Sequence, residues 1–180
     1  MMAIDPAIRG LCALLLALIF GASGAMKLRD VELFEGSLAD YQLTPHMIEK
    51  PLAYLLPILE CAAAAGLLKS STRTGAAFML LALLAIFTGA IAINLARGRR
   101  SIDCGCFGPA LRQELSGWLL ARNVFLIIVA SIVILPQTTR TLESIDVMTI
   151  VMGAITFVTL YSSANFAISN APKLRALQMR

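Results

Sequence analysis

The sequence predicts an all-α membrane protein, a polytopic bundle of about five transmembrane helices. Its 180 residues are 58% hydrophobic and only 14% charged, and their mean hydropathy is +0.80. A soluble domain carries roughly a quarter charged residues, so this composition argues against a soluble enzyme and against disorder. Five apolar stretches, at 8–26, 52–68, 75–96, 118–135 and 147–168, approach the ~17–25 residues that a spanning helix needs. None alternates with a period of two, as a barrel strand would, so we treat 1–180 as a single integral membrane domain.

The first stretch has two interpretations. Arg9, the apolar residues 11–20 and the small residues 21–25 resemble a cleavable signal peptide. The alternative is a retained helix whose small residues allow close packing against a neighbouring helix. We favour the retained helix, because the apolar core continues into the small residues, and Lys27 and Arg29 resemble an ordinary helix-end anchor.

The distribution of basic residues predicts the orientation. With five spans, the loops after the first and third spans share one face with the C-terminal tail. Eleven Lys and Arg residues lie in or beside these segments: Lys27, Arg29, Lys50, Arg97, Arg99, Arg100, Arg112, Arg122, Lys173, Arg175 and Arg180. The opposite face has Arg9, Lys69, Arg73 and Arg140. The positive-inside rule therefore places the eleven-residue face in the cytoplasm of a cell-membrane protein.

A short amphipathic segment follows the first span. Val31, Phe34, Leu38 and Tyr41 recur at helical spacing, which predicts a short interfacial helix, or alternatively a loop helix that packs on the bundle. In the second span, Pro57 lacks the amide hydrogen that would bond to the carbonyl four residues earlier, so it predicts a kink.

Two of the four cysteines are candidates for redox chemistry. Cys12 and Cys61 lie within spans, where a thiol behaves as a small apolar group. Cys104 and Cys106 lie in the loop between the third and fourth spans, separated only by Gly105. Glycine gives the backbone the freedom to close a small ring, and a strained disulfide is an exchangeable one. Neighbouring arginines favour the thiolate that attacks, whereas Asp103 opposes it.

Two other interpretations of this pair stay open. The loop or its disulfide could be purely structural, or the cysteines could bind a metal together with His46 and Asp103. A structural zinc site wants four ligands, and nothing in the spacing selects for metal. The sequence also lacks nucleotide-binding, zinc-protease and serine-elbow motifs. We therefore expect no metal, no cofactor and no nucleic-acid partner.

Glu60 is a candidate for an intramembrane catalytic role. It lies about nine residues into the second span, roughly 13 Å deep by helical rise, where an ionisable group is costly unless it is neutralised or paired. Arg122 is either a lipid-headgroup anchor or a partner for an acidic group. The alternative for Glu60 is a structural hydrogen bond to one of three residues near or within spans: Asn94, Asn123 or Asn165.

Several of these motifs together resemble a known family. They comprise residues 27–30, Phe34, Leu38, residues 41–45, Leu56-Pro57 with Glu60, residues 94–100, residues 102–109 and Arg122-Asn123. The glycine-separated cysteine pair after the Arg-Gly-Arg run is the most specific of them. On these features the chain resembles the methylamine utilization protein MauE family, within the wider MauE/DoxX-like group of redox-associated membrane proteins. The last span and the tail add no motif.

The resemblance implies a function. MauE-like proteins assist maturation of the disulfide-rich small (beta) subunit of methylamine dehydrogenase, beside MauD, a periplasmic thioredoxin-like partner. Carried onto this chain, the redox role falls on Cys104 and Cys106 only. A periplasmic partner conflicts with a cytoplasmic cysteine loop, and we keep the loop inside on the charge count.

Two other functions stay open beside thiol–disulfide exchange. A non-catalytic assembly factor for the same subunit would depend on interfacial residues such as Phe34 and Tyr41. A small-molecule permease would depend on Glu60 and the kinked second span.

Overall fold

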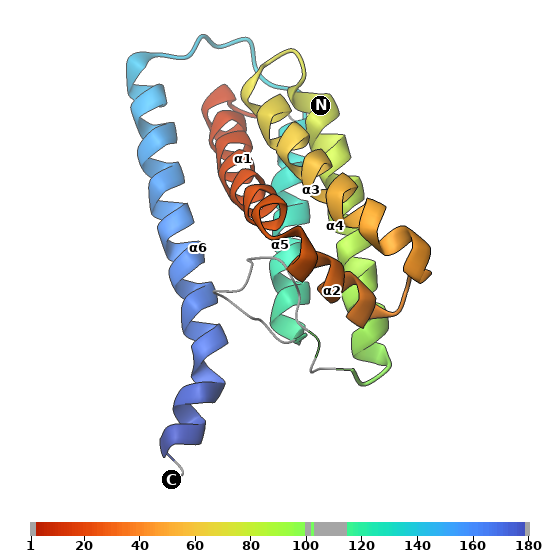
Figure 1. Ribbon diagram of the computed structural model, residues 1–180. Helices are drawn as coiled ribbons and strands as arrows, with labels where there is room; N and C mark the ends of the chain where they lie inside the picture. Colours follow the sequence, from red (N-terminus) through yellow and green to blue (C-terminus); the bar gives the residue numbers. More distant parts are fainter. Residues whose placement is uncertain (1–2, 100–101, 103–114, 179–180) are drawn as a thin grey trace.

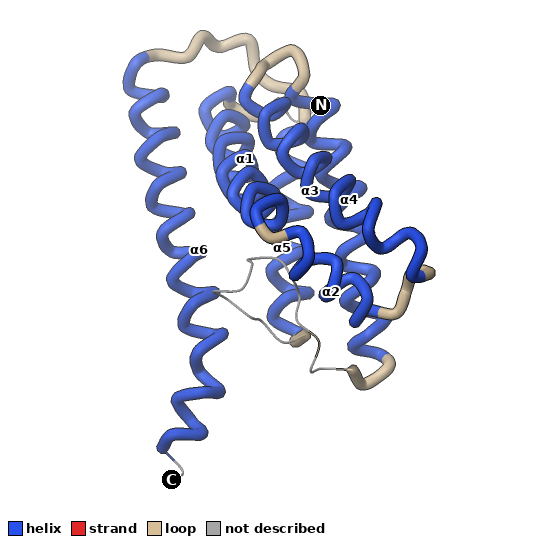
Figure 2. Tube along the Cα trace, viewed as in Figure 1, coloured by secondary structure: helices blue, strands red, loops and turns tan. Residues whose placement is uncertain are grey.

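The structure, a computed structural model, is all-helical. It describes residues 3–99, 102 and 115–178, with side chains as far as 168 and at 170. These residues form six helices, and five of them are long and apolar enough to cross a membrane, which confirms the predicted fold class (Figures 1 and 2). The helices are α1 (Pro6–Arg29), α2 (Val31–Tyr41), α3 (His46–Leu68), α4 (Arg73–Ala96), α5 (Gly117–Ile134) and α6 (Ser144–Gln178).

Four of the five spanning helices are longer than the apolar stretches that predict them, and α5 has the same length as its stretch. The helix α3 begins at His46 rather than at residue 52, and α6 continues to Gln178 rather than ending at 168. Apolar composition marks only the part of a helix that meets lipid, so the helix continues until a cap or breaker stops it. The helix α1 begins at such a cap: the side chain of Asp5 accepts a hydrogen bond from Ala7 N at 2.8 Å.

The helix α1 lies in the middle of the bundle and packs against α2, α3, α5 and α6 (Figure 1). Its approach to α3 is close at two glycines. A Cβ atom on Gly24 would lie 2.7 Å from Cys61 Sγ and 3.0 Å from the carbonyl oxygen of Pro57, and one on Gly21 would lie 3.6 Å from Ala64 Cβ. The small residues of α1 therefore do pack closely against a neighbour, as the sequence predicts.

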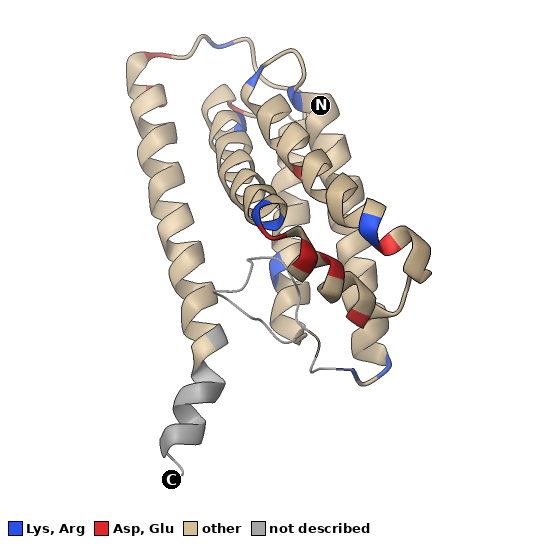
Figure 3. Ribbon diagram, viewed as in Figure 1, with Lys and Arg blue, Asp and Glu red and all other residues tan. Residues whose placement is uncertain are grey.

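The short helix α2 follows α1 after a single residue, Asp30, whose side chain caps it by accepting from Leu33 N at 3.3 Å. It packs on α3 and buries Phe34 and Tyr41, while Glu32 is exposed. Acidic residues recur along α2 (Figure 3). The predicted helix is confirmed, and its apolar face packs on the bundle.

Loops gather at the two ends of the bundle (Figure 2). At the end that carries the α3–α4 and α5–α6 loops, Ile4 pairs with the backbone of Pro136 and Thr138. There Arg9 donates to Val133 O at 2.8 Å and to Thr74 Oγ1 at 2.9 Å. Outside the spans, hydrogen bonds to Asp146 and Asp5 raise the pKa of Arg140.

Candidate functional site

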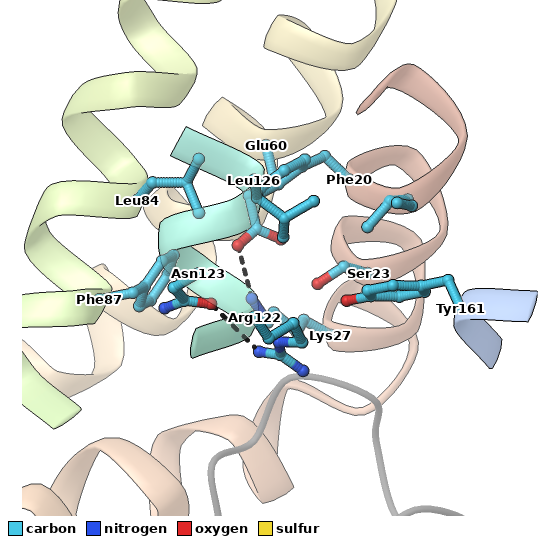
Figure 4. Close-up of a pocket in the computed structure, with 11 residues that line it drawn as sticks. Phe20, Ser23, Lys27, Glu60, Leu84, Phe87, Arg122, Asn123, Leu126 and Tyr161 are labelled. Atoms are coloured by element: carbon cyan, nitrogen blue, oxygen red, sulfur yellow. Dashed lines mark hydrogen bonds and ion pairs between the residues drawn. The ribbon is translucent and has the colours of Figure 1, made fainter. Parts of the chain in front are cut away.

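A small cavity inside the bundle is lined by several of the buried polar residues. It has a volume of about 30 Å³, which is enough for water molecules. All five spanning helices contribute side chains to it (Figure 4). The polar lining residues are Ser23, Lys27, Glu60, Arg122, Asn123 and Tyr161, and the apolar ones are Ile19, Phe20, Leu84, Phe87 and Leu126.

The centre of this cavity is an ion pair between α1 and α3. Lys27 Nζ lies 2.5 Å from Glu60 Oε1, and the two side chains are only 3% and 1% exposed. The close approach of the helices at Gly24 brings them together, because Glu60 Cβ lies next to the position that a Cβ of Gly24 would occupy. A buried ion pair loses its hydration, so removing one partner leaves a costly unpaired charge.

Two aromatic rings complete the surroundings of the lysine. Lys27 Nζ lies 4.7 Å from the ring centre of Phe87 on α4 and 5.0 Å from that of Phe34 on α2. Both distances fall within the range in which a ring face attracts a cation. The ammonium group therefore joins four helices, α1 to α4, at one point.

A second polar chain joins α5 to α4. Arg122 Nη2 lies 3.4 Å from Asn123 Oδ1, and Asn123 Nδ2 donates to Thr88 Oγ1 at 3.2 Å. The hydroxyl of Thr88 in turn donates to the carbonyl of Leu84. From α6, Tyr161 points toward Ser23 across the cavity (Figure 4).

The structure corrects two sequence interpretations. Lys27 is not a helix-end anchor, because it is buried and paired with Glu60. Arg122 is not a lipid-headgroup anchor, because it is 7% exposed and lines the cavity. The sequence did contain a signal for the pairing of Lys27. A carboxylate deep in a span requires a cation, and Lys27 lies at the end of the neighbouring apolar stretch.

The three asparagines considered for Glu60 have other bonds. Asn94 donates to the carbonyl of Ala90 and Asn165 to that of Tyr161, each four residues earlier on its own helix. Asn123 is the one that shares the cavity with Glu60. Ser23, Thr88 and Tyr161 carry no signal in the sequence, because hydroxyls are ordinary within spans.

The cysteines fall into two groups. Cys12 on α1 and Cys61 on α3 are free, partly buried thiols. Cys104 and Cys106 lie outside the described residues, so their predicted redox role stays a prediction. Within the described residues, no group of three or more His, Cys, Asp and Glu side chains converges on a point where a metal ion would fit.

The residues that flank the cysteine segment are fixed to the bundle. Leu115 N donates to Ile102 O at 3.1 Å, so the chain enters and leaves segment 103–114 at one place. Both residues are buried in an apolar cluster with Tyr41 of α2, Ile91 of α4 and Leu119 of α5. We call this cluster, from Ile102 and Leu115 to Tyr41, Ile91 and Leu119, the loop clasp.

Fold and site together define a class: a polytopic helical membrane protein whose spans meet at a buried, charged, water-sized cavity. The family described as "Methylamine utilisation protein MauE" matches residues 5–136. The chain belongs to the MauE family. It is 40% identical over 123 residues to the methylamine utilization protein MauE of Paracoccus denitrificans, which is 68% of this chain and 66% of that protein.

Two further relatives carry the same name. The protein of Methylorubrum extorquens is 38% identical over 126 residues, or 70% of this chain and 68% of that protein. The protein of Paracoccus versutus is 35% identical over 163 residues, or 89% of this chain and 87% of that protein. No solved structure matches this chain.

Proposed function

We propose that this chain is a cell-membrane accessory protein of methylamine utilization that exchanges thiols and disulfides through Cys104 and Cys106. Its client is the small subunit of methylamine dehydrogenase, and its direct partner is a MauD-like protein of the thioredoxin fold. Family membership supports the methylamine context. The observation that carries the redox role is the loop clasp, together with the Cys-Gly-Cys sequence that it brackets.

The loop clasp supports the redox role because thiol–disulfide exchange needs accessible sulfur atoms in a loop whose ends are held in place. The described thiols, Cys12 and Cys61, lie within spanning helices, where a water-soluble partner has no access. Ile102 and Leu115, which flank the segment that holds Cys104 and Cys106, are instead buried against residues of α2, α4 and α5. We propose that a partner meets Cys104 and Cys106 while Ile102 and Leu115 stay in place.

The exchange balances without a further reagent. One thiolate of the pair attacks a sulfur of the partner's disulfide, which forms a mixed disulfide and releases one partner thiolate. The second cysteine attacks the mixed disulfide, so that a Cys104–Cys106 disulfide forms and the partner leaves as a dithiol. The pair is oxidised and the partner is reduced by two electrons, and the reverse reaction passes the disulfide back.

The charge count still favours a cytoplasmic position for this loop. Lys27 and Arg122 are buried, which leaves nine of the eleven basic residues on the face of the loop against four on the other. On the other face, Arg9 is held by hydrogen bonds to α4, α5 and the α5–α6 loop. We therefore propose the inward orientation, in which the exchange at Cys104 and Cys106 takes place on the cytoplasmic face.

Serine substitution tests the redox role. We expect Cys104→Ser and Cys106→Ser each to abolish maturation of the dehydrogenase small subunit while the membrane protein still accumulates. Cys12→Ser and Cys61→Ser are the matched controls, and we expect them to leave maturation intact. Maturation at the normal level in the Cys104→Ser/Cys106→Ser double variant would remove the redox role and favour a non-catalytic assembly factor.

Thiol labelling tests sidedness and redox state in the same cells. With Cys12 and Cys61 replaced, a membrane-impermeant thiol reagent should label Cys104 and Cys106 only after the cells are opened and disulfides are reduced. Labelling of intact cells would place the loop outside and would contradict the inward orientation.

A further inference from the structure

The lysine of the cavity is held in the way that proteins hold a bound alkylammonium ion. Its Nζ has a carboxylate oxygen of Glu60 at 2.5 Å and the rings of Phe87 and Phe34 at 4.7 Å and 5.0 Å. A carboxylate combined with aromatic ring faces is a common means of recognising organic ammonium ions. Here the ion is the end of a side chain of the protein itself.

These three recognising groups come from three different helices. Glu60 is on α3, Phe87 on α4 and Phe34 on α2, whereas the ammonium group arrives from α1. The site is therefore formed by the packing of the bundle and not by the local sequence around the lysine. Glu60 is 1% exposed and Phe34 is 5% exposed, so the site is shielded from bulk solvent, which strengthens both attractions.

We propose that Glu60, Phe34 and Phe87 form a binding site for primary alkylammonium ions, which Lys27 occupies and closes. The inference goes beyond the thiol–disulfide function and does not depend on Cys104 or Cys106. The ligand class follows from the contacts: an NH₃⁺ group to donate to the carboxylate, and a short apolar stem to lie among the residues that surround the stem of Lys27.

Tethering explains why the native site is closed. The side chain of Lys27 is always present at the site, so a free ion competes against a high effective concentration. The cavity that remains beside the pair, about 30 Å³, is of a size that takes water. The carboxylate of Glu60 in α3 then marks an internal bond rather than a route for a free amine.

Shortening Lys27 should open the site for a ligand whose size follows from the atoms removed. Lys27→Ala removes three carbons and the ammonium nitrogen, which n-propylammonium replaces atom for atom. Methylammonium replaces only the terminal carbon and nitrogen. We expect n-propylammonium to raise the unfolding temperature of purified Lys27→Ala protein by about 3–6 °C with saturation, and methylammonium to raise it less.

Several controls isolate the ammonium site. Neutral 1-propanol and tetramethylammonium, which has no N–H to donate, should give no saturable rise in Lys27→Ala. Lys27→Met fills the space of the stem without charge and should not respond to n-propylammonium. The exposed lysine Lys50 gives a matched substitution, and Lys50→Ala should not respond either. The Lys27→Ala/Glu60→Gln double variant should lose the response.

The outcomes decide the proposal. If Lys27→Ala fails to accumulate in cells, its accumulation becomes the measurement, and growth with n-propylammonium should restore it. No restoration, or no saturable rise in purified Lys27→Ala, would overturn the alkylammonium site. A saturable response of the wild-type chain to methylammonium would overturn the statement that Lys27 closes it.

Discussion

The first and last spanning helices of this bundle differ sharply in how they are held. Half of the most apolar stretch of α1 is buried inside the protein, against 6% of that of α6. The helix α1 packs on four other helices and supplies Lys27 to the cavity, whereas the main packing partner of α6 is α1 (Figure 1). The family match at 5–136 covers α1 and ends before α6 begins at Ser144.

The difference between α1 and α6 shows which interactions hold a helix in place within a lipid bilayer. Lipid tails are as apolar as leucine, so burial of an apolar face gives little drive for helices to associate. The helix α1 is instead fixed by close approach at glycines and by a charge pair that has no alternative partner in lipid. Within its described residues, α6 comes close to α1 at two glycines, where Ile150 packs at Gly10 and Leu11 packs at Gly153.

Breaking the ion pair should have the largest effect. We expect Glu60→Ala to destabilise the protein by about 3–5 kcal/mol, because the ammonium group of Lys27 would stay buried without its carboxylate. The measurement is unfolding in mixed detergent micelles with a rising fraction of dodecyl sulfate. As a control, Glu32→Ala removes an exposed carboxylate of α2 and should change stability little.

The double variant Lys27→Met/Glu60→Leu separates the loss of the pair from the loss of one partner. Replacing a buried pair by apolar side chains of similar size is often neutral, so we expect most of the stability to return. If the double variant were as unstable as Glu60→Ala, the loss of stability would come from losing the ion pair itself and not from leaving the charge of Lys27 unpaired.

The same substitution on the two helices should sharpen the contrast. Leu16 on α1 is fully buried, and Leu160 on α6 is 62% exposed. We expect Leu16→Ala to cost about 2–5 kcal/mol through the cavity that it leaves. Leu160→Ala should cost under about 0.5 kcal/mol, because lipid fills the space. Equal losses in the same micelle titration would mean that α6 has a protein partner in the membrane.

Sequence alone predicted the fold well, for a physical reason. The apolar composition of each span identifies it in the sequence, because a helix that crosses the lipid bilayer must be apolar and long enough. The short helix α2 was predicted from the spacing of Phe34 and Tyr41, and the close packing of α1 from its small residues. These signals are local, so they can be read without knowing which helices touch.

The site was predicted only in part, because its contacts are not local. Glu60 stands out in the sequence as a carboxylate within a span, but its partner lies 33 residues earlier, in a position typical of an ordinary helix end. The roles of Phe87, Tyr161 and Ser23 depend on which faces of α4, α6 and α1 turn inward. Since every face of these helices is apolar, the pattern that identifies a buried face in a soluble protein is absent.

Substituting glycines should give the smallest and most graded effects. Gly24→Ala places a Cβ 2.7 Å from Cys61 Sγ and 3.0 Å from the backbone oxygen of Pro57, so α1 must move away from α3, and we expect a cost of about 1–3 kcal/mol. Gly153→Ala meets only the flexible end of Leu11, at 3.1 Å, and should cost less. Gly89→Ala meets nothing within 4 Å and should stabilise the helix by up to about 1 kcal/mol. The micelle titration gives the order of the three, and a Gly24→Ala protein as stable as Gly89→Ala would contradict the tight α1–α3 contact that brings Lys27 to Glu60.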